Sequence, residues 1–259
     1  MRPSATVVLV RAGPRGPEVY LVHRASGATF GSSYVFPGGV LEAADREATG
    51  RSDLENAEAN RRLGLEAGGL EYYSAAIREL FEETGVLLAR CRGGGPLPAP
   101  AALAAARARL NEGALDWSDF LEENGLVLAC ESLQYFAWWI TPRARPKRFS
   151  TRFFAAPLPE GQIASHDGRE LTDGRWMTAP EALEAARRGD IVLPPPTAAT
   201  LRDLAPLGDV AALFAWARRR AREGVPRILP VIVRQGGRDR VLVPGDPGYP
   251  ADAGGEGDA

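Results

Sequence analysis

Three glutamates in the first third of the chain have the spacing expected of a metal-binding face. Glu79, Glu82 and Glu83 fall at positions i, i+3 and i+4 of a predicted helix, so their carboxylates are close neighbours. Like charges repel at this spacing, and Gly85 predicts the helix end, where the helix dipole disfavours anions. A hard divalent cation such as Mg2+ or Mn2+, shared with substrate phosphates, would offset both effects. Taken alone, the pattern is equally compatible with the solvated end of a surface helix.

A second segment, residues 34–45, favours the metal-binding interpretation over the solvated helix end. It is expected to form a short apolar strand that turns through Pro-Gly-Gly, whose glycines permit close approach to a ligand. Together with residues 78–86, it resembles the signature of the Nudix hydrolase superfamily, Gly-x5-Glu-x7-Arg-Glu-(apolar)-x-Glu-Glu-x-Gly-(apolar). Gly39 matches the signature glycine, and residues 78–86 match the second half at every defined position.

The sequence departs from this signature at two points. Asp45 stands where the signature has its first glutamate, and Arg78 follows it by 33 residues instead of eight. The inserted residues 46–70 are polar and predict one helix, from residue 52 or 53 to Leu63, with a glycine-rich return. An interrupted box of this kind is similar to the Nudix branch that includes the peroxisomal coenzyme A diphosphatases. Shorter motifs extend the similarity over most of the chain, at residues 139–142, 148–154 and 193–197.

The Nudix resemblance implies a role for each residue of the acidic face. The residues expected to hold Mg2+ or Mn2+ and to act in catalysis are Glu79, Glu82 and Glu83. The adjacent pair is expected to provide most of the coordination, and the first glutamate to be a ligand or a base. Arg78, four residues before Glu82, is expected to pair with it and fix its rotamer.

Two further acids are candidates for completing the site. Asp45 is one carbon shorter than the family residue, and a helix-start or turn role explains it equally well. Glu170 precedes a predicted strand, and the alternative is that it is a solvated residue beside an Asp-Gly turn.

A separate set of residues is predicted to bind the substrate. The sequence from Leu21 to Gly39 partly matches a motif of shorter coenzyme A-cleaving Nudix proteins, and departs from it at one arginine and one glycine. A basic cluster at residues 143–152 can hold the phosphates of coenzyme A, although a solvated basic loop explains it as well. The candidate substrate-binding residues are Arg24, Phe36, Gly38, Gly39, Arg148 and Arg152.

Composition narrows the class of protein. A chain of 259 residues with 45% apolar content can bury a full core. Its net charge of −2 does not favour nucleic acid or a membrane surface as a partner. Two cysteines make no disulfide framework, and we find neither a signal peptide nor a membrane-spanning run, so we expect a soluble cytoplasmic protein.

The elements that must position these residues intermix without regular βαβ alternation, which favours a mixed sheet between helices. The Nudix resemblance implies an α/β/α sandwich with extra helical segments. Residues 1–195 are expected to form the catalytic domain, with insertions at 46–70 and 99–125, and residues 196–259 a helical C-terminal extension and tail. Strands are predicted at residues 6–10, 19–24, 86–89, 133–141, 152–156 and 171–177. Helices are predicted at residues 101–110, 116–124, 180–188, 197–204 and 209–222, and from residue 73 or 74 to Gly85.

The reaction that this reasoning favours is Mg2+-dependent hydrolysis of the diphosphate bond in a small nucleoside diphosphate derivative. Coenzyme A or acyl-coenzyme A is the favoured substrate, with 3′,5′-ADP and (acyl-)phosphopantetheine as products. ADP-ribose, NADH and related compounds are alternatives, and so is a catalytically silent Nudix-fold regulator that binds nucleotides. The sequence leaves the oligomeric state open, a homodimer included.

Overall fold

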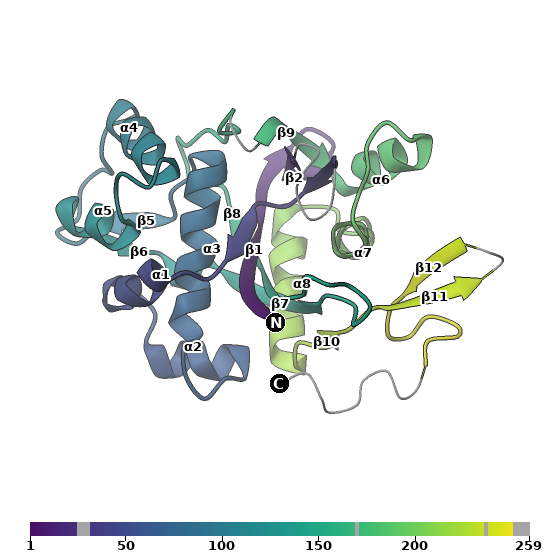
Figure 1. Ribbon diagram of the computed structural model, residues 1–259. Coiled ribbons are helices and arrows are strands. Elements are labelled where there is room, and N and C mark those ends of the chain that lie inside the picture. The colour runs from purple at the N-terminus through teal and green to yellow at the C-terminus, as the bar shows by residue number, and fades with distance from the viewer. Residues whose placement is uncertain (25–31, 169–170, 236–237, 251–259) are drawn as a thin grey trace.

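A central sheet is covered on both faces by helices in the computed structural model, which describes residues 1–24, 32–168, 171–235 and 238–250 (Figure 1). Among the described residues this sheet has eight strands. Six of them follow the order β10-β7-β8-β1-β2-β3, while β4 pairs with β1 and β9 pairs with β2. The pairs β1–β8 and β7–β10 are parallel and the other pairs in this sheet are antiparallel, so the predicted mixed α/β class is confirmed. The strands of this sheet are β1 (Arg2–Gly13), β2 (Gly16–Arg24), β3 (Ser33–Val35), β4 (Gly38–Val40), β7 (Gln134–Ile140), β8 (Phe149–Pro157), β9 (Leu171–Thr178) and β10 (Arg227–Ile228).

Helices α1 to α5 come from the first half of the chain and α6 to α8 from the second. Two-stranded sheets join β5 (Ala89–Cys91) to β6 (Leu126–Leu128) and β11 (Val231–Gln235) to β12 (Arg238–Leu242). The helices are α1 (Ala43–Glu47), α2 (Asn56–Leu63), α3 (Gly69–Thr84), α4 (Pro100–Asn111), α5 (Trp117–Glu123), α6 (Ala179–Arg188), α7 (Pro195–Leu204) and α8 (Val210–Glu223).

Strand β1 divides the core into two layers. Successive side chains of a strand point to opposite faces, so an apolar run is stable where both faces are covered. Val7 and Leu9 pack in the cluster under α3, whereas Val8 and Val10 pack in the cluster under α6, α7 and α8. The apolar run of β1 therefore positions α3 against one face of the sheet.

Helices α4 and α5 extend the layer that contains α3. Phe81 of α3 stacks on Phe120 of α5 with 5.4 Å between ring centroids, and Trp117 lies 6.3 Å from the same Phe81 ring. These rings are almost completely buried. The predicted helical insertion at 99–125 is thus a pair of helices packed against the second half of α3 (Figure 1).

Several predicted boundaries were wrong. Helix α3 begins at Gly69 rather than at residue 73 or 74, and α2 begins at Asn56 rather than at 52 or 53. The strand predicted at 86–89 lies instead at Ala89–Cys91. The apolar residues Val86, Leu87 and Leu88, which suggested a strand, are buried outside any sheet. The C-terminal extension is not wholly helical, since it contains β10, β11 and β12.

The packing of α7 and α8 ties the C-terminal extension to the sheet. Leu201, Leu213 and Trp216 are buried in one cluster with Phe136 of β7, and β10 pairs with β7. The domain boundary at 195 stays a prediction.

In the described part of the chain, no helix combines the length and apolar character needed to cross a membrane.

Candidate active site

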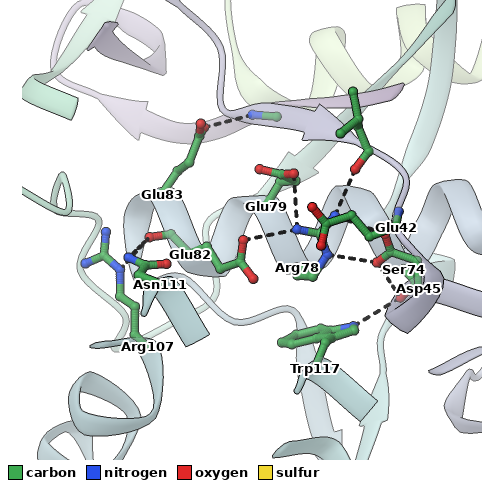
Figure 2. Close-up of polar contacts among 12 residues, drawn as sticks. Glu42, Asp45, Ser74, Arg78, Glu79, Glu82, Glu83, Arg107, Asn111 and Trp117 are labelled. Carbon is green, nitrogen blue, oxygen red and sulfur yellow. Dashed lines mark hydrogen bonds and ion pairs between the residues drawn. The ribbon is translucent and has the colours of Figure 1, made fainter. Parts of the chain in front are cut away.

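The acidic face lies in the last turns of α3, opposite strand β4. The helix ends at Gly85, whose φ of 73° is left-handed and whose N–H donates to the Phe81 carbonyl at 2.8 Å. Glu79 and Glu83 project toward β4, while the Glu82 side chain turns toward Arg78 (Figure 2). The predicted C-terminal end of this helix is confirmed.

The two glycines of strand β4 permit a close approach to α3 on one side and to β1 on the other. A Cβ atom on Gly39 would overlap the Glu79 carboxylate, and a Cβ on Gly38 would overlap the Ala5 carbonyl. The Gly38 N–H donates to Glu83 Oε2 at 2.9 Å. The Pro-Gly-Gly turn therefore seats two of the three glutamates against the strand.

Arg78 lies at the centre of a buried network of acidic groups (Figure 2). Its Nη1 donates to Glu79 Oε1 and to Glu82 Oε2, each at 3.1 Å, so the predicted pair with Glu82 is present. Its Nε and Nη2 donate to Asp45 at 3.0 and 2.9 Å, and Nη2 also donates to the Val40 carbonyl at 2.9 Å. One guanidinium thus fixes two glutamates while a third acid fixes the guanidinium.

Asp45 has the helix-start role that the sequence left open, and it also contacts the site through Arg78. It is wholly buried in the first turn of α1, where Oδ2 accepts the Glu42 N–H at 2.9 Å. The Ser74 hydroxyl donates to Asp45 Oδ1 at 3.2 Å, and Trp117 Nε1–H donates to Ser74 Oγ at 3.1 Å. These contacts occupy both carboxylate oxygens, so Asp45 orients Arg78 and is not placed to bind a ligand.

The charges of this face do not balance. Asp45 pairs with Arg78, and Glu83 forms an ion pair with Arg24, which also donates to the Gly38 carbonyl at 2.8 Å. Burial raises the pKa of Glu79 and raises that of Glu82 to about 7, against the opposing effect of Arg78. Negative charge of nearby carboxylates adds to both pKa shifts, from Asp45 and Glu42 for Glu79 and from Glu79 and Glu42 for Glu82. The face therefore has an excess of negative charge that a divalent cation would neutralise.

The donor set fits a cation that keeps part of its water shell. No three His, Cys, Asp or Glu side chains of the described segments are grouped as a preformed metal centre. Mg2+ is commonly held by only one or two protein carboxylates together with substrate phosphates. Glu79 and Glu82 provide such carboxylates, whereas both oxygens of Glu83 are engaged by Gly38 and Arg24.

The predicted substrate-binding residues are not all near this face. Arg24 is part of it through Glu83. Phe36 is buried in the cluster on the other side of the sheet, where it packs in the core. Arg148 lies at the β7–β8 turn, where its Nε donates to the Thr141 carbonyl at 3.2 Å.

Arg152 is buried in an aromatic pocket of its own. Its guanidinium carbon lies 3.7 Å from the Trp138 ring centroid and 5.5 Å from that of Tyr135. Its contacts are therefore aromatic rather than with the acidic face, and phosphate binding by Arg152 stays a prediction. Glu170 lies outside the described residues.

Other residues of the site escaped sequence reasoning. They bond to Asp45 or to the Glu82 carbonyl, directly or through Ser74, and comprise Glu42, Ser74, Arg107, Asn111 and Trp117. The last three come from the insertion at 99–125, and no local pattern there indicates contact with α3. Only the proximity of Glu42 to the Gly-Gly turn was a usable signal.

The sheet sandwiched by helices and the arginine-linked glutamate face together define a Nudix pyrophosphohydrolase. The family model described as "NUDT19 Nudix domain" matches residues 67–204. The acyl-coenzyme A diphosphatase NUDT19 of Gallus gallus is 32% identical, over 96% of this chain and 80% of that protein. Its Homo sapiens counterpart is 29% identical, over 85% of this chain and 69% of that protein. The chain belongs to the NUDT19 Nudix domain family.

A solved structure supports the same fold. The Nudix hydrolase from Alicyclobacillus acidocaldarius superposes with a TM-score of 0.71 at 27% identity. The match covers 83% of this chain and 96% of the bacterial one, so the shared fold spans most of both chains.

Proposed function

We propose that this protein hydrolyses the diphosphate bond of coenzyme A or acyl-coenzyme A. Water is added across the bond between the two phosphoryl groups, which gives 3′,5′-ADP and 4′-phosphopantetheine or its acyl derivative. The observation that supports the proposal best is the retention of all three glutamates in a chain 32% identical to a protein named acyl-coenzyme A diphosphatase.

The proposed division of labour follows the contacts of the site. Glu79 and Glu82 would hold Mg2+ or Mn2+, and Glu83 would join them after exchanging a contact with Gly38 or Arg24. The bound cation would neutralise phosphate charge and lower the pKa of a water molecule. Arg78 holds Glu79 and Glu82 through the same nitrogen, Nη1, and Asp45 keeps Arg78 in place.

The test is a hydrolysis assay with Mg2+ on coenzyme A, acetyl-coenzyme A, ADP-ribose and NADH, with products separated by chromatography. We expect 3′,5′-ADP from the first two substrates, and loss of turnover in Glu82→Gln with an unchanged unfolding temperature within a few degrees. Glu184→Gln, on the exposed face of α6, is the matched control and should be as active as the wild type. Cleavage of ADP-ribose or NADH alone would refute the coenzyme A assignment, and binding of Mn2+ without any hydrolysis would favour the regulator.

A further inference from the structure

The carbonyl of Glu82 cannot be satisfied within its own helix. In a continuing α-helix it would accept the N–H of residue 86, four positions on. Here the Val86 N–H is bonded to Thr84 Oγ1 at 3.2 Å, because the chain leaves the helix at Gly85. The carbonyl therefore needs donors from elsewhere in the fold.

Two side chains of α4 provide these donors. Arg107 Nε donates to the Glu82 carbonyl at 2.8 Å, and Asn111 Nδ2 donates to it at 3.2 Å (Figure 2). The two residues are four positions apart, so they project from the same face of α4. Arg107 also donates through Nη2 to the Ser165 carbonyl at 3.0 Å, and the Ser165 N–H donates to the Thr84 carbonyl at 2.9 Å.

The peptide group that α4 holds is the one that joins Glu82 to Glu83. Its orientation sets the direction in which both side chains leave the backbone. Glu82 turns toward Arg78 and Glu83 toward Gly38, so a small rotation of this peptide would move both carboxylates. Helix ends ordinarily fray, and an end held by solvent alone would permit such rotation.

The positive charge of Arg107 at the C-terminal end of α3 also has an electrostatic effect. Arg107 is half-buried, and burial lowers its pKa while Asp167, Tyr20 and Glu83 oppose that shift. Its charge at the negative end of the α3 dipole is favourable and partly offsets the glutamates in the last turn.

We propose that Arg107 and Asn111 are positioning residues that hold the Glu82–Glu83 peptide and thereby set the geometry of the metal-binding carboxylates. The inference rests on the proposed function only in taking these glutamates as metal ligands. It assigns a role to α4, the first helix of the insertion at 99–125. Six of its 12 residues are alanine, and its polar side chains are Arg107, Arg109 and Asn111.

The experiment compares Arg107→Met and Asn111→Leu with Arg109→Met, an exposed arginine on the same helix. Binding of Mn2+ alone is measured by electron paramagnetic resonance of the free ion, well below the unfolding temperature of each variant. Positioning residues of this kind typically change metal affinity or activity by about 10- to 100-fold. We expect a loss in that range for the first two variants, partial recovery in Arg107→Lys, and wild-type behaviour in Arg109→Met.

A double-mutant cycle separates positioning from general stability. If Arg107 acts through the Glu82–Glu83 peptide, the losses of Mn2+ affinity in Arg107→Met and Glu82→Gln should be less than additive in the double variant. Equal Mn2+ affinity in all the α4 variants would overturn the inference, as would losses that are additive with Glu82→Gln and parallel the fall in thermal stability. A wild-type protein that binds Mn2+ but does not cleave coenzyme A would refute the proposed substrate, while the Mn2+ measurements would still test the inference.

Discussion

The substitution Asp45→Asn tests whether the acidic face depends on a buried ion pair. The side chain of Asp45 is wholly buried and that of Arg78 is 4% exposed, so solvent screens their interaction little. The asparagine would keep the size of the side chain while removing its charge and placing an NH2 group among donors. Breaking one partner of a buried pair typically costs about 3–5 kcal/mol.

A cost of that size is large for a single domain, whose total free energy of unfolding is about 5–15 kcal/mol. In a chain of this length, each kcal/mol lowers the unfolding temperature by about 2–4 °C, so we expect a fall of roughly 6–20 °C. Activity should fall further than stability explains, because Arg78 would no longer hold Glu79 and Glu82 in place.

The assay is urea unfolding of the metal-free protein followed by tryptophan fluorescence, together with kcat at a temperature where each variant is folded. Glu184→Gln breaks an exposed pair with Arg187 and should leave the unfolding midpoint nearly unchanged. Asp45→Glu retains the charge and should retain more activity than Asp45→Asn. A midpoint for Asp45→Asn equal to that of Glu184→Gln would refute the view that this pair organises the site.

Three other perturbations address the close approach, the charge and the burial of particular residues. Gly39→Ala should reduce kcat, because the new methyl group would push the Glu79 carboxylate aside. We expect a reduction of about 100-fold, which is typical of a 1 Å displacement. The control is Gly50→Ala, whose new methyl group meets no atom within 4 Å and which should be neutral in the same assay. In metal-free protein the free energy of unfolding should fall as the pH rises from about 5 to about 8, because native Glu82, with its pKa of about 7, retains a proton that the unfolded chain releases. The measurement is calorimetry in EDTA at several pH values, and a free energy of unfolding that rises over this range would contradict the prediction. Only one of the two thiols should react with Ellman's reagent in the folded protein, because Cys130 is buried and burial raises its pKa to about 12; labelling of both thiols before unfolding would refute this.

Local signals predicted the helix that carries the glutamates, but only at one end. Gly85 predicted the C-terminal boundary because a left-handed residue ends a helix through its own backbone. The start was missed because Gly68 and Gly69 read as a loop. In the structure the Gly69 N–H donates to Asn60 Oδ1 at 2.7 Å, and a Cβ on Gly69 would overlap the backbone of α2. The helix can begin there only because another helix packs against it, which no local pattern reveals.

The same distinction separates the predicted from the unpredicted parts of the site. The pair between Arg78 and Glu82 is a contact within one helix and follows from spacing. The stronger partner of Arg78 is Asp45, 33 residues earlier, and the donors to the Glu82 carbonyl are more than 20 residues later. Side chains that act across such separations depend on tertiary packing, so sequence spacing alone could not identify them.

The inserted residues 46–70 can interrupt the Nudix signature without separating its parts. The insertion begins directly after Asp45 and ends at the start of α3, where α2 packs beside the first turn of α3. The glutamates lie in the last turns of α3, at the end of the helix opposite the insertion. Lengthening a loop costs little free energy once its ends are held together, and here the Asp45–Arg78 pair and the Gly39–Glu79 contact hold them. The interruption is therefore compatible with an intact site because the two halves of the signature meet through side chains rather than through consecutive residues.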